Sequence, residues 1–222
     1  MSYIELKAYC RLPFHRLKVA SDGLVSMCSS QERNTIGNII DQSFEEIWLG
    51  KTARDIREEV IRNRIHPNCL TKSCPYVSSV KKLTDLEFKK YPIELELDLP
   101  RPDQTNKLEA ICQKIRPYME HFRYVIASNG VEPFENNKIY EVLNWLNYKN
   151  NIHLATLTSG KFDVIEFLKF TNTSLTFSIS AARSDTYLSL KNADLDLVMN
   201  NIKEYHSKRG KEQKLRIYND IN

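Results

Sequence analysis

The chain has 222 residues, of which 41% are hydrophobic and 27% are charged, and its formal net charge is +4. This ordinary mixture excludes a disordered chain, a collagen-like fibre and a coiled-coil rod. No apolar run approaches the roughly 20 residues that a membrane-spanning helix needs, and the net charge alone is too small to indicate nucleic-acid binding. The first residues lack the apolar stretch of a signal peptide. We therefore expect a cytoplasmic protein that binds neither membrane nor nucleic acid.

The first predicted elements form a β-hairpin. Residues 15–20 alternate polar and apolar side chains, as a half-buried strand does, and residues 24–28 have the composition of a return strand. Asp22-Gly23 lies between them and favours a type I′ turn, in which both central residues have positive φ. Such a hairpin would bring Cys28 back alongside the segment that begins near Cys10.

A turn and a helix are predicted next. Gly37-Asn38 has the composition of a turn. Ser43 and Glu46 have the spacing of a capping box, in which each side chain bonds to the backbone N–H of the other residue. The sequence therefore predicts one helix that begins after Ser43 and continues to about Asn63, before Pro67.

The cysteines are unevenly distributed. Of the five, Cys10, Cys28, Cys69 and Cys74 lie in the first third of the chain, and Cys112 stands apart. An odd number without an export signal favours thiols or metal ligands over disulfides. Thiolates suit zinc or an iron–sulfur cluster, and the spacing does not separate these two. The alternative is four small buried hydrophobic side chains.

The rest of the chain alternates between strand and helix patterns, which predicts an α/β fold with a parallel sheet. The charged residues 77–91 are interpreted as a linker between a Cys-rich lobe (1–76) and an α/β domain (92–222). The expected strands are 93–99, 123–128, 152–158, 175–180 and 215–218, and the expected helices are 107–119, 136–148, 162–170 and 195–206. About five strands make a partial sheet, not a closed eight-stranded barrel.

The Cys-rich lobe resembles a known family. Its motifs follow one another in a specific order: Cys10-Arg11-Leu12-Pro13-Phe14, Asp22-Gly23 with Val25 and Cys28, Ile36-Gly37-Asn38-Ile39, Ser43 to Gly50, Arg57, Cys69 and Cys74-Pro75. This order is similar to a SPASM/Twitch domain, which carries auxiliary [4Fe–4S] clusters in radical SAM enzymes. A full SPASM domain has seven cysteines and two clusters. The resemblance therefore implies a Twitch-like version in which Cys10, Cys28, Cys69 and Cys74 ligate one [4Fe–4S] cluster.

Residues 93–219 resemble a shortened, degenerate radical SAM core. Where that family carries the CxxxCxxC motif of its catalytic cluster, this chain has Thr105, Glu109 and Cys112. The stretch from Gly130 through Glu132 to Phe134 is similar to the Gly-Gly-Glu-Pro segment that contacts the methionine amine of SAM. The resemblance makes Gly130 and Glu132 the candidate residues for any retained SAM binding. A local turn is the alternative role of Glu132.

These observations predict an iron–sulfur protein without radical SAM catalysis of its own. We expect it to act in electron transfer or as an accessory to a modifying enzyme, with a radical SAM enzyme or a peptide or protein substrate as its partner. A superfamily enzyme that still binds SAM is one alternative. A zinc-stabilised interaction protein is the other. Cys112, among apolar residues of a predicted helix, is interpreted as a core thiol.

Overall fold

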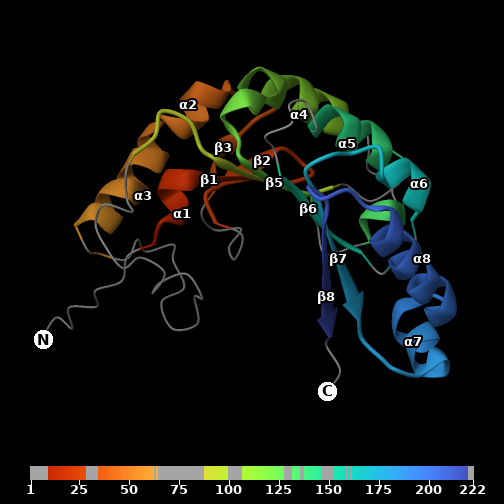
Figure 1. Ribbon diagram of the computed structural model, residues 1–222. Coiled ribbons are helices and arrows are strands. Elements are labelled where there is room, and N and C mark those ends of the chain that lie inside the picture. The colour runs from red at the N-terminus through yellow and green to blue at the C-terminus, as the bar shows by residue number, and fades with distance from the viewer. Residues whose placement is uncertain are drawn as a thin grey trace, which may run out of the picture.

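One curved mixed sheet organises the molecule. A computed structural model describes residues 10–28, 35–62, 64, 88–99, 107–127, 132–135, 138–146, 153–158, 160 and 162–219. Within these ranges the sheet has eight strands in the order β3-β2-β1-β4-β5-β6-β7-β8. Strands β1 and β4 to β8 run parallel to one another, whereas β2 is antiparallel to both β1 and β3. The sheet bends into an arch with the helices along its outer side (Figure 1).

The elements have the following bounds. The strands are β1 Arg16–Val19, β2 Leu24–Ser26, β3 Thr35–Asn38, β4 Glu94–Leu97, β5 Tyr124–Ala127, β6 His153–Thr158, β7 Thr173–Ile179 and β8 Lys214–Asn219. The helices are α1 Leu12–His15, α2 Phe44–Trp48, α3 Lys51–Ile61, α4 Leu108–Ile115, η4 Arg116–His121, η5 Pro133–Glu135, α5 Ile139–Leu146, α6 Val164–Phe167, α7 Ser184–Lys191 and α8 Leu195–Lys208. The predicted α/β class and all five predicted strands are confirmed, whereas β3, α1 and α7 were not predicted.

The sheet is larger than the predicted five strands because the N-terminal hairpin joins it. Strand β1 pairs in parallel with β4, so that Leu17 lies opposite Leu95 and Val19 lies opposite Leu97. All four side chains are buried under the helices. The strands of the two predicted parts therefore share one core, although the domain boundary at 77–91 stays a prediction.

The hairpin is confirmed, but its turn differs from the predicted type I′. In the described hairpin only Gly23 has a positive φ, at 93°. Its N–H donates to the carbonyl of Ala20 (2.9 Å), and the N–H of Ala20 donates to the carbonyl of Leu24 (2.8 Å). This is a three-residue loop in which a type I turn precedes a left-handed residue. Aspartate precedes that position, and only the glycine must adopt the left-handed conformation.

The predicted capping box is confirmed, but the single helix is wrong. Ser43 Oγ accepts from the Glu46 N–H (3.2 Å), and the Glu46 carboxylate accepts from the Ser43 N–H (2.8 Å). The helix divides into α2 and α3 at Gly50, where the backbone is extended. A Cβ on Gly50 would lie 2.3 Å from the carbonyl oxygen of Glu46, so only glycine permits this close turn.

The predicted turn at Gly37-Asn38 is also displaced. Both residues pair with β2 as part of β3, opposite Val25 and Leu24. The chain turns immediately afterwards, where the carbonyl of Asn38 accepts from the N–H of Gln42 (3.0 Å). The Gln42 side chain closes this turn by accepting from the N–H of Asn38 (2.9 Å).

An aromatic cluster packs α2 against the second part of the chain. The Phe44 ring stacks on Tyr118 with a centroid distance of 4.1 Å, and Tyr91 stacks on His121 at 4.0 Å. The Tyr118 hydroxyl also donates to the Glu45 carboxylate (2.6 Å). Aromatic pairs at these distances contribute beyond their area of burial. The cluster therefore joins α2 to η4 on the outer side of the sheet, next to the β1–β4 pairing.

The described helices are short. Within the described part of the chain, none is both long and apolar enough to cross a membrane.

Candidate metal centre

Two of the four predicted cysteine ligands lie among the described residues. Cys10 and Cys28 are both half-buried. Lys18 pairs with Ser26 across the hairpin, and continuing this antiparallel register brings Cys28 level with Arg16, where β1 begins. Helix α1 leads from Cys10 into the same end of β1. The hairpin thus returns Cys28 to the end of the sheet at which the Cys10 segment enters.

The strand end at Cys28 is fixed by a local contact, because the Ser26 hydroxyl donates to the Cys28 carbonyl (3.1 Å). Cys69 and Cys74 lie outside the described residues. In the described ranges, no group of three His, Cys, Asp or Glu side chains is placed to hold a metal ion. The four-cysteine ligand set therefore stays a prediction.

Arg57 is the charged side chain most deeply buried near this end of the sheet. It lies on α3 and is only 4% exposed. Its Nε donates to the Pro13 carbonyl and its Nη1 to the Trp48 carbonyl, both at 2.8 Å. The guanidinium carbon also lies 4.1 Å from the centroid of the Trp48 ring. Burial lowers the pKa of Arg57 to about 10.

The third guanidinium nitrogen of Arg57 has a different environment. Nη2 is buried and has no hydrogen-bond partner within the described structure. No carboxylate of the described chain pairs with this cation. Soft thiols at Cys10 and Cys28, together with a buried cation that has an unused donor and holds the Pro13 carbonyl three residues after Cys10, fit an anionic thiolate-ligated group. The sequence resemblance contains Arg57 only as one position in the order of motifs.

A ladder of charges covers the opposite face of β1 and β4. Arg16 contacts Glu94 (2.9 Å) and Glu96 (3.4 Å), and Lys18 contacts Glu96 (3.4 Å) and Asp98 (3.1 Å). Burial raises the pKa of the Asp98 carboxyl, although Lys18 opposes this shift. Burial also acts to lower the pKa of Lys18, but Asp98 and Glu96 raise it above its ordinary value. The ladder ties the hairpin to β4 electrostatically.

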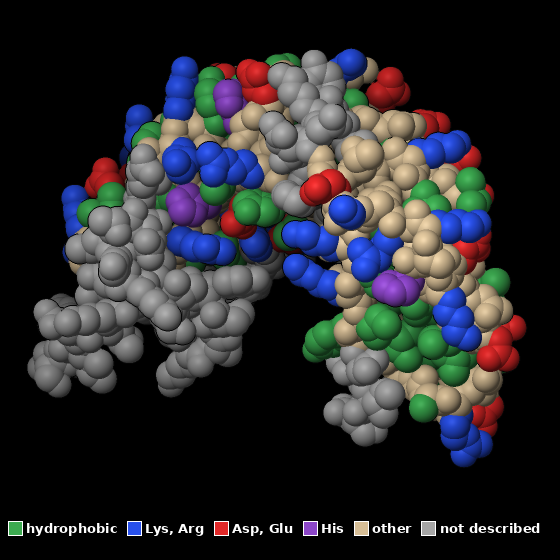
Figure 2. Space-filling view, in the orientation of Figure 1, with side chains coloured by type: hydrophobic (Ala, Val, Ile, Leu, Met, Phe, Trp, Pro, Cys, Tyr) green, Lys and Arg blue, Asp and Glu red, His purple; other side chains and the backbone are tan. Residues whose placement is uncertain are grey.

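The ladder belongs to the underside of the arch, which no described helix covers. Figure 2 shows Lys and Arg side chains on both sides of the hollow beneath the sheet. On the far side, the strand alternation places Lys214 and Arg216 of β8 on this same face. Lys191 of α7 reaches it as well and donates to the Ser178 hydroxyl (3.4 Å). Cations therefore lie at both ends of the underside, at β1 and at β8, with Tyr124 and Ile126 of β5 on the same face between them.

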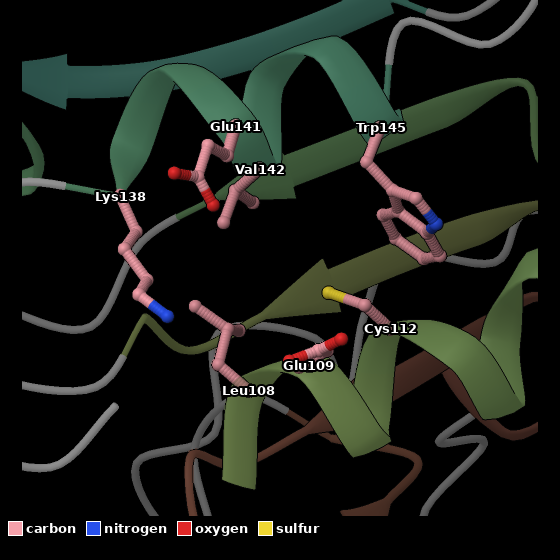
Figure 3. A pocket seen from close by; sticks show the side chains of 7 residues that line it. All are labelled: Leu108, Glu109, Cys112, Lys138, Glu141, Val142 and Trp145. Atoms are coloured by element: carbon pink, nitrogen blue, oxygen red, sulfur yellow. The ribbon is translucent and has the colours of Figure 1, made fainter. Parts of the chain in front are cut away.

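Cys112 is separate from the candidate metal centre. It lies on α4, is 9% exposed, and borders a cavity of about 190 Å³ between α4 and α5 (Figure 3). Burial raises the pKa of its thiol to about 12, and the nearby charge of Glu109 acts in the same direction. A thiol that stays protonated at neutral pH is a poor metal ligand. The interpretation of Cys112 as a core thiol fits this environment.

Of the two candidate SAM-binding residues, the structure describes Glu132. Its carboxylate accepts from the N–H of Phe134 (3.3 Å), which is a local turn contact. Gly130 lies outside the described residues. SAM binding through this segment stays a prediction.

Comparison with known families supports the cysteine-rich lobe specifically. Residues 10–75 match the family model of an iron–sulfur cluster-binding domain. The family is SPASM, as the sequence resemblance implied. The match starts at Cys10 and ends directly after Cys74. No curated protein and no solved structure matches the chain. Because the match ends before β4, the resemblance of the second part to a radical SAM core stays a prediction.

Proposed function

We propose that this protein holds one [4Fe–4S] cluster through Cys10, Cys28, Cys69 and Cys74 and transfers electrons as an accessory to a modifying enzyme. The observation that carries the proposal is the family match, which is bounded by the first and the last of these cysteines. When bound, the cluster would supply one-electron redox chemistry. The protein's own residues would hold the cluster, set its surroundings and present it to a partner.

The second part of the chain is proposed to bind that partner instead of catalysing a radical SAM reaction. In the stretch similar to the catalytic motif, Thr105 and Glu109 replace two cysteines. The remaining Cys112 faces the core as a protonated thiol. The underside, with cations at its β1 and β8 ends, offers a surface for a radical SAM enzyme or a peptide or protein substrate. A cytoplasmic location agrees with the use of reduced thiols as ligands.

Anaerobic purification with iron, sulfide and zinc analysis tests the cluster. We expect about four iron and four sulfide per chain with a brown absorption spectrum. Cys28→Ala and Cys69→Ala should lose most of this iron. Cys112→Ala is the matched control and should retain it, because Cys112 lies outside the family match. A colourless protein with one zinc ion, or with no metal, would contradict the proposal.

Electron transfer requires a second measurement on the loaded protein. A spectroelectrochemical titration should give reversible one-electron reduction with unchanged iron content after a full cycle. Loss of iron on reduction would argue against electron transfer and leave a structural role for the cluster.

A further inference from the structure

The environment of Arg57 suggests a role toward the proposed iron–sulfur site. A buried charge is costly unless it is paired and hydrogen-bonded. Arg57 has two carbonyl partners and the rings of Trp48 and Phe88, but no counter-ion in the described structure. Its Nη2 donor is also unused. The two carbonyl hydrogen bonds account for Nε and Nη1, whereas nothing in the described structure accounts for the charge or for the Nη2 donor.

Arg57 is hydrogen-bonded to the segment that follows Cys10, the first predicted cluster ligand. Its Nε–H holds the carbonyl of Pro13, which follows Cys10 by three residues. Three residues span at most about 11 Å, so the backbone of Pro13, whose carbonyl Arg57 holds, lies within this reach of the Cys10 backbone. Its Nη1–H holds the carbonyl of Trp48 at the end of α2. Arg57 thus ties α1, which directly follows Cys10 and Arg11, to α2 and α3 of the same lobe.

Resting on the proposed function, we propose that Arg57 is a positioning residue of the iron–sulfur site. Its hydrogen bonds to the Pro13 and Trp48 carbonyls hold α1, which follows Cys10, against the end of α2. Its unpaired charge favours the more negative, reduced state of the thiolate-ligated group. In a titration the added electron comes from the reductant, and no bond forms or breaks at Arg57. Reduction potentials of such sites depend on net charge and on nearby hydrogen bonds.

Two substitutions separate the two parts of this role. Arg57→Lys keeps the charge but cannot donate along two fixed directions. Arg57→Gln keeps amide donors but removes the charge. Arg54→Gln removes an exposed charge from the same helix and is the matched control. All variants would be purified anaerobically and compared for iron content, helical circular dichroism and midpoint potential.

We expect Arg57→Lys to contain less iron than the wild-type protein and to keep its midpoint potential in the loaded fraction. Arg57→Gln should have a lower midpoint potential, and Arg54→Gln should match the wild type in both measurements. Full iron content in Arg57→Lys would overturn the positioning role. A potential of Arg57→Gln equal to that of Arg54→Gln would overturn the electrostatic role.

Failure of this inference is distinguishable from failure of the proposed function. A wild-type protein without iron rejects the proposed function, whereas normal wild-type iron with unaffected Arg57 variants rejects only the inference. If Arg57→Gln does not fold, the iron content of Arg57→Lys decides the positioning role. Loss of iron with normal circular dichroism would support that role.

Discussion

The two parts of this chain present different kinds of signal. In residues 10–75, cysteines, a capping box and single glycines stand at particular positions, and this part matches a family. From β4 onward the elements repeat a strand–helix alternation, and the match does not extend there. Periodic burial specifies a parallel sheet without specifying a reaction. The fold is therefore easier to predict from the sequence of the second part, and the chemistry from the sequence of the first.

The structure joins these two parts through the β1–β4 pairing and the aromatic cluster. The strongest test is therefore whether they unfold together. Phe44→Ala and Phe177→Ala each remove a buried ring, one from each part. Each should lower the free energy of unfolding by about 3–5 kcal/mol, measured by urea denaturation.

The chain has two tryptophans, Trp48 in the first part and Trp145 in the second. The variants Trp145→Phe and Trp48→Phe would each leave one fluorescent reporter for one part. If the two parts unfold together, Phe44→Ala and Phe177→Ala should each lower the urea midpoint that the remaining tryptophan reports, in either background. A substitution that shifts only the midpoint reported by the tryptophan of its own part would show that the parts unfold independently.

The charge ladder should contribute less than the rings. Glu96→Gln removes the carboxylate that contacts both Arg16 and Lys18, while each cation keeps another partner. We expect a loss of about 1–3 kcal/mol, because the pairs are largely shielded from water. The exposed pair of Lys208 and Glu204 provides the control. Glu204→Gln should cost only about 0.3–0.5 kcal/mol, and equal losses would mean that the ladder is electrostatically unimportant.

Alanine substitutions at two glycines, one in each part, should have a smaller effect on stability. Gly23 and Gly160 have φ angles of 93° and 91°, one in each part. An added Cβ would lie 2.6 Å from Asn38 Oδ1 or from Val198 Cγ1, respectively. Each alanine substitution should cost about 1–2 kcal/mol. Only Gly23→Ala should also reduce iron content, because that turn returns the chain toward Cys28. Equal iron loss in Gly160→Ala would contradict a specific role for the hairpin.

The thiol of Cys112 should be unreactive in the folded protein. Because burial raises the pKa of Cys112 to about 12, the thiolate population at pH 8 is about a thousandfold below that of an ordinary thiol. Native Cys112 should therefore react with iodoacetamide far more slowly than in urea, as measured by peptide mass spectrometry. Rapid native alkylation would mean that this thiol is accessible and acidic.

Local features were easiest to predict from the sequence where a residue type is required for a single physical reason. Gly23 marks the hairpin because its turn needs a positive φ, and Ser43 with Glu46 marks a helix start. The break at Gly50 was missed because it depends on the close approach of the Glu46 carbonyl. Helix α7 was missed because Leu188 and Leu190 are exposed and give no regular apolar face.

Long-range pairing was less accessible to prediction. The contact between β1 and β4 joins residues that lie more than seventy positions apart, and neither strand encodes its partner. A local signal for Arg57 did exist. Ala53, Ile56, Arg57 and Val60 share the helical spacing of a buried face, and they are all buried. A charged residue in that pattern could have been recognised as a candidate functional group, while its orphaned donor required coordinates.

The position of β1 inside the sheet has one more consequence. A fragment that begins after the cysteine-rich lobe would start its sheet at β4 and expose the full backbone edge that β1 covers. The complementary fragment would expose the matching edge of β1. Open edges are templates for aggregation. Each part therefore covers a sheet edge of the other. We expect the two fragments to give more soluble protein when they are expressed together than when each is expressed alone.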